Sequence, residues 1–176
     1  MGGEDALIFD AASLAKAQAD LPGVIFQAME GKSAEALLHD LIRAAGRDLN
    51  LALIITPDSH GTIPLGQRAA LEEMGRWLVN HAASIYETRG GPLAPADWGV
   101  STIKGQKIYI HYLADHGGTL VFPASIGNVR SAYHFDHGRA MDLSVREGEY
   151  VLEIPAGELD PVDTIVVLEL GEPARE

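Results

Sequence analysis

The first half of the chain alternates short apolar runs with stretches of helical periodicity. Residues 6–9 and 23–26 are apolar runs of strand length, separated by an alanine-rich stretch over 11–20 that favours a short helix. Residues 49–55 form a continuous aliphatic run, which is typical of a parallel strand covered on both faces. The pattern therefore predicts strands alternating with helices, the order of an α/β fold.

Two longer amphipathic helices are predicted on either side of this aliphatic run. Ser33 precedes apolar residues spaced three and four apart, so it is expected to cap a helix that ends near Gly46. Pro64 suits the first turn of a second helix, which we expect to run to about Tyr86. Trp77 falls on the apolar stripe of that helix and is predicted to anchor the core.

The second half has the pattern of an all-β domain. The stretch over residues 90–98 is rich in Gly and Pro and discourages both helix and strand, so we place a domain boundary after residue 92. Strand-like segments follow at residues 107–113, 119–122, 129–135, 141–145, 150–154 and 164–170. They predict an antiparallel β-sandwich over 93–176, after an α/β segment over 1–92.

Composition narrows the classes of partner. The chain has 176 residues and a formal net charge of -12, from 13 Lys and Arg against 25 Asp and Glu. Such a surface repels phosphate backbones and anionic membranes, so neither nucleic acid nor a membrane is an expected partner. No apolar run approaches the roughly 20 residues that span a bilayer, and we expect no export signal at the start. The absence of cysteine excludes disulfides and thiolate chemistry, and the cellular compartment stays open.

Several polar residues admit both a functional and a structural interpretation. Glu30, just before the first long helix, could act as an acid or base, or could interact with the helix dipole and solvent. His134 and His137, with Asp136 between them, invite a metal interpretation. Side chains three residues apart in a strand-to-turn region are expected to diverge. We therefore favour solvated loop residues and predict no metal and no cofactor.

Aromatic residues of the second half could form a platform on which a sugar stacks: Trp98, Tyr109, Tyr112 and Tyr133. Alternation along the strands turns some of them inward, so packing is the favoured interpretation. The sequence offers no Gly-rich phosphate loop, no Ser/His/Asp set and no paired Cys/His framework.

A series of short motifs covers the end of the first half. They are Ser33-Ala34-Glu35, then NLALIITP over 50–57, GTIP over 61–64, GRWL over 75–78 and IYETR over 85–89. In order and spacing these motifs resemble the barrel-closing segment of family 29 glycoside hydrolases, the α-L-fucosidases. A hairpin over 104–109, a strand start at 129–131 and a strand over 163–170 resemble the terminal sandwich of the family. The resemblance covers about residues 33–172.

This resemblance implies that the first half supplies the terminal βα units of a TIM-type barrel, followed by the C-terminal antiparallel β-sandwich of the family. The loop after the last barrel strand would lie at the C-terminal rim, where barrel enzymes hold their active sites. Thr56, Asp58 and His60 would then border a sugar pocket. Asp58 and His60 also suit a plain turn, which is the favoured interpretation. The expected ligand is a fucosylated glycan or another carbohydrate.

The chain departs from the family pattern at this rim. Ile54 stands where the family has Asn, Thr56 where it has Gly, and His60 where it has Asp, which reduces the polar capacity of the rim. A retaining glycosidase needs two carboxylates about 5 Å apart, and in the family both lie before this segment. We therefore predict no catalytic residue in this chain, and whether the chain is an enzyme stays open.

Two hypotheses follow for its function. In the first, the chain is the C-terminal portion of an α-L-fucosidase-like retaining hydrolase, completing the barrel rim and bracing it with a β-sandwich. Three parallel strands cannot close a barrel, and their open edges invite another chain or a homo-oligomer. The alternative, motivated by Ile54, is a free-standing, non-catalytic carbohydrate-binding or protein-interaction module derived from such an enzyme.

Overall fold

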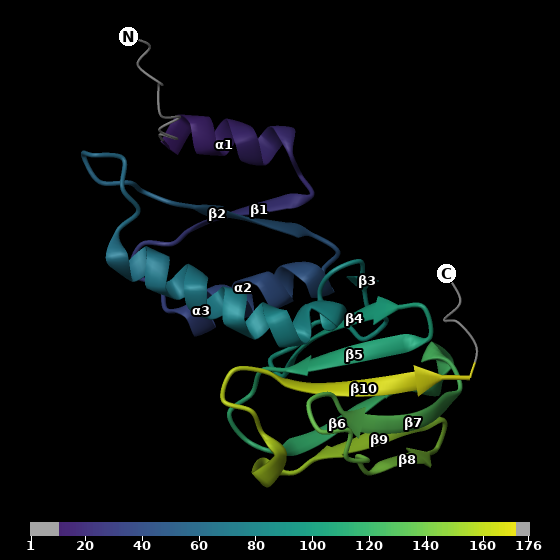
Figure 1. Ribbon diagram of the computed structural model, residues 1–176. Coiled ribbons are helices and arrows are strands. Elements are labelled where there is room, and N and C mark those ends of the chain that lie inside the picture. Colours follow the sequence, from purple (N-terminus) through teal and green to yellow (C-terminus); the bar gives the residue numbers. More distant parts are fainter. Residues whose placement is uncertain (1–10, 172–176) are drawn as a thin grey trace.

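The computed structural model describes residues 11–171, in which a helical part lies above two stacked sheets (Figure 1). The predicted strand over residues 6–9 lies outside the described residues. Within residues 11–171, no helix is long and apolar enough to cross a membrane. An α/β part therefore precedes an antiparallel β part along the chain.

The helical part alternates helices with two parallel strands. Its elements are α1 (Ala11–Asp20), β1 (Val24–Ala28), α2 (Ala34–Gly46), β2 (Asn50–Ile54), α3 (Leu65–His81) and the 3-10 turn η1 (Ala82–Ser84). β1 and β2 pair in parallel, from Val24 opposite Asn50 to Ala28 opposite Ile54. The predicted order of helices and strands is confirmed from residue 11 onward.

α2 forms where its cap and its apolar spacing predict it. The Ser33 side chain accepts a hydrogen bond from the Ala36 amide at 3.1 Å, so the predicted N-cap is confirmed. Leu37, Leu38 and Ile42 are buried along one side of the helix. Leu37 and Leu38 pack α2 against α3 and β2, and Ile42 packs it against β4.

α3 begins directly after Pro64, but it ends at His81 rather than continuing to Tyr86. The Ser84 hydroxyl donates to the His81 carbonyl at 2.8 Å, and the Ser84 carbonyl accepts from the Thr102 hydroxyl at 2.6 Å. These two bonds tighten the chain into η1 and tie it to the second half of the protein, which explains the early end of the helix.

The second half forms two antiparallel sheets, with strand orders β3-β4-β5-β10-β7 and β6-β9-β8. The strands are β3 (Arg89–Gly90), β4 (Gly99–Lys104), β5 (Lys107–Tyr112), β6 (Gly118–Pro123), β7 (Val129–His134), β8 (Leu143–Arg146), β9 (Glu149–Ile154) and β10 (Thr164–Leu170), with 3-10 turns η2 (Ala124–Ile126) and η3 (Ala156–Glu158). Every predicted strand of the second half is present. The predicted antiparallel β-sandwich is confirmed.

The strand segments predicted from the hydrophobic pattern do not include β3 and β4, although the family resemblance indicated a hairpin over 104–109, where β4 turns into β5. Ser101 and Thr102 of β4 are polar and yet completely buried. The Ser101 hydroxyl accepts from the Leu93 amide at 3.1 Å, and Thr102 donates to Ser84, so their burial is compensated by hydrogen bonds. A hydrophobic pattern does not reveal such a strand. β3 joins the larger sheet ahead of the predicted boundary, and the division at residue 92 stays a prediction.

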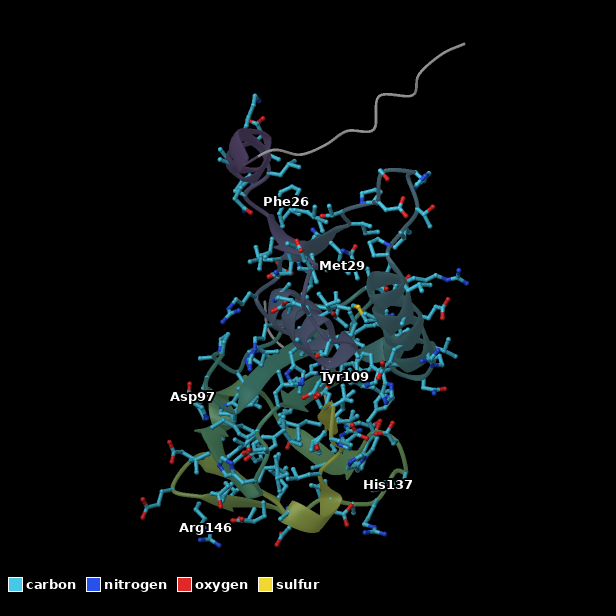
Figure 2. The ribbon with its side chains drawn as sticks, turned by 90° about the vertical axis from the view of Figure 1, so that its left-hand side faces the viewer. Phe26, Met29, Asp97, Tyr109, His137 and Arg146 are labelled. Carbon is cyan, nitrogen blue, oxygen red and sulfur yellow. The ribbon has the colours of Figure 1, made fainter. Side chains whose placement is uncertain are left out.

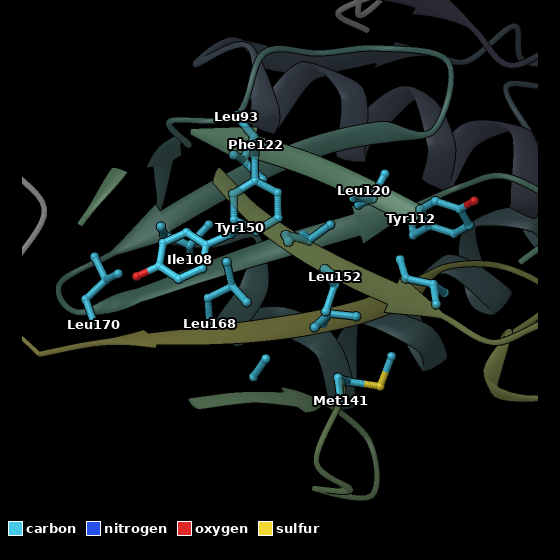
Figure 3. Close-up of a cluster of buried hydrophobic side chains, with 14 residues drawn as sticks. Leu93, Ile108, Tyr112, Leu120, Phe122, Met141, Tyr150, Leu152, Leu168 and Leu170 are labelled. Carbon is cyan, nitrogen blue, oxygen red and sulfur yellow. The ribbon is translucent and has the colours of Figure 1, made fainter. Parts of the chain in front are cut away.

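The core of the sandwich lies between the two sheets (Figure 3). Ile108 and Leu168 of the larger sheet face Leu152 of the smaller sheet, and all three are fully buried. Phe122 and Tyr150 complete one end, with ring centroids 5.7 Å apart. The sandwich therefore has a continuous apolar core of its own.

Two packing contacts help to hold the helical part on the sandwich. Trp77 is partly buried and packs on two apolar clusters, one between α2 and α3 and one around Tyr109 and Val167 of the sandwich. Its predicted role as an anchor of the core is therefore confirmed. At the end of α2, a Cβ on Gly46 would lie 2.4 Å from the Val100 Cβ, so only glycine allows this approach. We refer to the contact of α2, α3 and η1 with β4, β5 and β10 as the helix–sandwich interface.

The β1–β2 pair is much less buried than the sandwich, and no residue in either strand is fully buried. Leu53 packs on the cluster beneath α2 and α3, so alternation places Phe26, Ala52 and Ile54 on the opposite face. α1 lies beyond the strands from α2 and α3 (Figures 1 and 2), but of residues 15–20 only Ala17 is partly buried. The opposite face is therefore incompletely covered by the described residues.

Candidate functional site

A groove of about 390 Å³ opens at the carboxyl ends of β1 and β2. Its walls are the segment after β1, the second residue after β2 and the start of α3: Met29, Glu30, Gly31, Lys32, Thr56, Pro64, Gly66 and Gln67. Parallel strands place their carboxyl ends at one edge, where α/β proteins commonly bind ligands. We refer to this feature as the rim groove.

Backbone and side-chain contacts hold the walls of the rim groove. The Met29 amide donates to the Ile54 carbonyl at 3.1 Å, which joins the ends of the two strands. The Thr56 amide donates to the Gln67 side-chain oxygen at 3.3 Å, which ties the loop to α3. Lys32 pairs with a carboxylate of α2, and both side chains are about one third exposed. The groove is thus built by three segments that are fixed to one another.

Of the residues predicted to border a sugar, Thr56 lines the rim groove, whereas Asp58 and His60 are not among its lining residues. The Asp58 carboxylate accepts from the His60 amide at 2.8 Å and from the Thr62 amide at 2.9 Å. Gly61 turns the chain with a φ of 76°. Asp58 therefore organises a turn, the interpretation favoured from the sequence. Contact of these residues with a sugar stays a prediction.

Glu30 is exposed and is the one carboxylate among the residues that line the rim groove. The position agrees with the idea of an acid or base at this edge, but retaining hydrolysis requires two carboxylates about 5 Å apart. The residues that line this groove supply one carboxylate.

The expectation that His134 and His137 diverge was wrong. Their rings stack with centroids 4.0 Å apart and an angle of 16° between the planes. Gly138, with a φ of 65°, turns the chain, and its amide donates to the His134 carbonyl at 2.9 Å. This turn brings the two rings together. Asp136 bonds instead to His81 at 2.8 Å, and residues 11–171 contain no group of three or more His, Cys, Asp or Glu arranged to hold a metal.

The aromatic residues of the second half do not share one face. Tyr109 is buried at the helix–sandwich interface (Figure 2), whereas Tyr112 is buried between the two sheets. Trp98 is partly buried against the sandwich core. The Tyr133 hydroxyl donates to Glu169 at 3.0 Å. The packing interpretation is therefore confirmed over the stacking platform.

Sequence reasoning missed a polar network inside the helix–sandwich interface. The His111 ring lies 2.6 Å from the Asp163 carboxylate, and both side chains are completely buried. Thr102 and Ser84 extend the network to η1. His111 interrupts the apolar pattern of β5, and a polar residue at such a position was the signal in the sequence that could have indicated a buried hydrogen-bond network. Its partner is 52 residues away in the sequence.

Part of the chain matches a known protein family. Residues 25–83 match the sequence model of a family described as Alpha-L-fucosidase. No curated protein sequence gives a significant match.

Solved structures extend the likeness to most of the chain. α-L-fucosidase isoenzyme 1 from Paenibacillus thiaminolyticus is 22% identical with a TM-score of 0.73, over 85% of this chain and 40% of that one. An α-fucosidase from Thermotoga maritima is 22% identical with a TM-score of 0.68, over 83% and 39%. A family 29 enzyme from Bacteroides thetaiotaomicron is 17% identical with a TM-score of 0.68, over 78% and 32%.

The chain spans about two fifths of the length of the first two structures, in their C-terminal part. At these identities the structural likeness establishes the fold, and the matched segment contains most of the motifs on which the sequence resemblance rests. The resemblance is therefore confirmed: the chain has the sequence pattern of the α-L-fucosidases over residues 25–83 and the fold of the C-terminal part of family 29 enzymes.

Proposed function

We propose that the chain is the C-terminal portion of an α-L-fucosidase-like retaining glycoside hydrolase. In this proposal β1 and β2, with their helices, are terminal βα units of a TIM-type barrel, and residues 93–176 are the sandwich that braces it. The observation that carries the proposal is the rim groove, which lies at the carboxyl ends of two parallel strands within the segment that matches the family. Barrel enzymes hold their active sites at this end of the strands.

The exposure of β1 and β2 supports a larger barrel. Each strand pairs only with the other among the described residues, so each has one free edge. Phe26, Ala52 and Ile54 form an apolar face that is incompletely covered, although apolar parallel strands are normally covered on both faces. Free edges and an apolar face favour further strands beside them, supplied by another chain or by a second copy.

Hydrolysis with retention needs a nucleophilic carboxylate and an acid/base carboxylate. Since the rim groove contributes Glu30 alone, we assign both catalytic carboxylates to the rest of the barrel. The role of this chain is then to shape one side of the sugar pocket, with Thr56 at the groove and Asp58 and His60 in the adjoining loop. The proposed ligand is a fucosylated glycan. Structures of the Thermotoga maritima proteins in complex with fucose and with a fucosyl-fucose azide motivate this choice.

The sandwich supports the rim through α2. Gly46 lets the end of α2 reach Val100, and His39 in the middle of α2 lies 2.6 Å from the Val162 carbonyl. α2 is therefore held on the sandwich at its middle and at its C-terminal end. Since its first turn follows the Met29–Lys32 wall of the groove, the sandwich positions that wall.

A free-standing carbohydrate-binding or interaction module is the alternative. Ile54 favours it, because an apolar side chain ends β2 beside the rim groove, where the family pattern has a polar Asn. Such a module would bind a sugar or a partner without hydrolysing it.

The test is an assay of aryl α-L-fucoside hydrolysis by the purified chain, alone and co-expressed with any barrel portion encoded beside it. We expect turnover only in the co-expressed complex, and a Thr56→Val variant should raise its KM. Turnover by the chain alone that Glu30→Gln abolishes would overturn the assignment of the carboxylates. Calorimetric binding of L-fucose to the chain alone, with no turnover in any combination, would favour the binding module instead.

A further inference from the structure

Two histidines join α3 and η1 to the sandwich, and in each of them both ring nitrogens lie close to an oxygen atom. His81, the last residue of α3, has Nδ1 at 2.7 Å from the Trp77 carbonyl and Nε2 at 2.8 Å from an Asp136 carboxylate oxygen. Its ring also stacks on Trp77, with centroids 4.3 Å apart, and on Phe135 at 5.7 Å. The ring is thus held between a helix and the loop after β7.

His111 of β5 is enclosed in the same way. Its Nδ1 lies 2.6 Å from Asp163, and its Nε2 lies 3.3 Å from the Ser84 carbonyl and 3.4 Å from the Thr102 hydroxyl oxygen. Thr102 donates its own hydrogen to the Ser84 carbonyl at 2.6 Å, so toward His111 its oxygen is an acceptor. No exposed surface remains on the side chains of His111 and Asp163.

Carbonyl and ionised carboxylate oxygens accept hydrogen bonds and cannot donate them. A neutral imidazole carries a hydrogen on one nitrogen, so it can donate a hydrogen bond to the acceptors at one of its two ring nitrogens but not at the other. The imidazolium form carries a hydrogen on both nitrogens and satisfies both. We propose that His81 and His111 are doubly protonated in the folded protein and form a proton-dependent fastening of α3 and η1 to the sandwich.

The surroundings of each ring favour the cation. His81 ends a helix of 17 residues, where the helix dipole attracts positive charge. The carboxylate that faces His81 is Asp136. The other titratable groups nearby are His134, 3.7 Å from Asp136, and the pair of His137 with Glu158, 3.4 Å apart. Of these groups, Asp136 is the one in direct contact with His81.

For His111 the facing groups are Asp163, from the loop before β10, with Ser84 of η1 and Thr102 of β4. The second Asp163 oxygen, Oδ1, is buried without a hydrogen-bond partner in residues 11–171. A buried carboxylate needs a paired charge, and His111 is the group in contact with it. Loss of the His111 proton would leave that carboxylate unpaired inside the interface.

The fastening therefore weakens as the pH rises and the rings lose a proton. Deprotonated His81 can no longer donate to both Trp77 and Asp136, and deprotonated His111 can no longer donate to both Asp163 and Ser84. The end of α3 would then separate from the sandwich. This inference rests on the interface alone and stands or falls independently of the proposed glycosidase function.

The first test is nitrogen NMR of the intact chain with ¹⁵N-labelled histidine. At neutral pH, we expect His81 and His111 to show both ring nitrogens bonded to hydrogen. A single protonated nitrogen in His81 or in His111 at neutral pH would overturn the inference for that residue. Because this measurement uses the unaltered chain, it does not depend on a variant that folds.

The second test compares thermal unfolding of His81→Gln with that of the matched surface control His116→Gln, at about pH 6 and about pH 9. We expect His81→Gln to lower the Tm at the lower pH and to cost clearly less at the higher pH, where the wild-type contact is already weakened. His116→Gln should change little at either pH. An equal loss of Tm for His81→Gln at both values would contradict a proton-dependent contact.

Discussion

The parallel pair β1–β2 and the antiparallel β10 are both apolar, but their environments differ. β10 lies between β5 and β7, and six of its seven residues are buried. No residue of β1 or β2 reaches that state, although their sequences are as apolar as that of β10. The difference lies in neighbours rather than in composition: β10 has a strand on each side and a sheet beneath it. The sandwich is self-sufficient in its packing, whereas the exposure of the strand pair supports the proposal that it belongs to a larger sheet.

Amide hydrogen exchange should separate the two regions most strongly. β1 and β2 have free edges and partly exposed side chains, so their amides should exchange through local opening. Amides of β5 and β10 should exchange only through global unfolding and should therefore be protected by orders of magnitude more. Exchange followed by mass spectrometry on the isolated chain would measure this. Equal protection of both regions would contradict the contrast and the proposed need for further strands.

Truncation of a core side chain gives the next largest effect. Ile110→Ala removes a completely buried side chain at the centre of β5 and should lower the free energy of unfolding by about 2–5 kcal/mol. Val121→Ala is the matched control, since Val121 of β6 is 55% exposed, and it should cost well under about 1 kcal/mol. Urea unfolding followed by circular dichroism measures both. A similar loss for the two variants would mean that the sandwich core is not where the stability lies.

Glycine substitutions test the contact between the two regions. Gly46→Ala would place a Cβ 2.4 Å from the Val100 Cβ, and the resulting shift of α2 against β4 should cost about 1–3 kcal/mol. Gly75→Ala meets no atom within 4 Å in α3 and should stabilise the protein by about 0.5–1 kcal/mol through helix propensity. The opposite signs can be read from the midpoints of urea unfolding. A neutral Gly46→Ala would show that α2 does not depend on this close approach.

The same two regions differ in how much the sequence predicts. The β-branched and aromatic runs of the sandwich indicate their strands directly, because alternation and turns are local signals. The hydrophobic pattern did not indicate β4, because its buried residues Ser101 and Thr102 are polar. Hydrogen bonds to other segments of the chain compensate for their burial. The end of α3 was overestimated for the same reason, since the bonds of Ser84 lie outside the helix pattern.

The candidate site was predicted to a similar extent. The position of Thr56 after a parallel strand was enough to place it at the rim groove, because topology fixes where strands end. The turn role of Asp58 followed from its residue type. The stacking of His134 on His137 depends on the turn at Gly138, and the pairing of His111 with Asp163 joins two distant strand ends. Neither has a signal in local spacing.

The smallest expected effect is a pH dependence on the outer face of the sandwich. Hydrogen bonding from Tyr133, with Lys107 and Ser131 adding to it, lowers the pKa of Glu169 below its ordinary value of 4.5. Tyr133 lies 3.0 Å and Lys107 3.4 Å from the Glu169 carboxylate, so the charged form links β7, β10 and β5. A carboxylate with a lowered pKa adds stability above its ordinary pKa, and this stability disappears as the pH falls through the lowered value.

Glu169→Gln should therefore lower the Tm slightly at neutral pH and leave it unchanged in acid, once the wild-type carboxylate is protonated. The effect is small because the side chain is 42% exposed and solvent screens its contacts. Glu153→Gln is a useful control in the smaller sheet, since Glu153 accepts a hydrogen bond from Thr119 at 2.8 Å on an exposed face and forms no salt bridge within residues 11–171. The opposite pattern, with Glu169→Gln costing more in acid than at neutral pH, would show that the protonated carboxyl and not the charged one holds the three strands together.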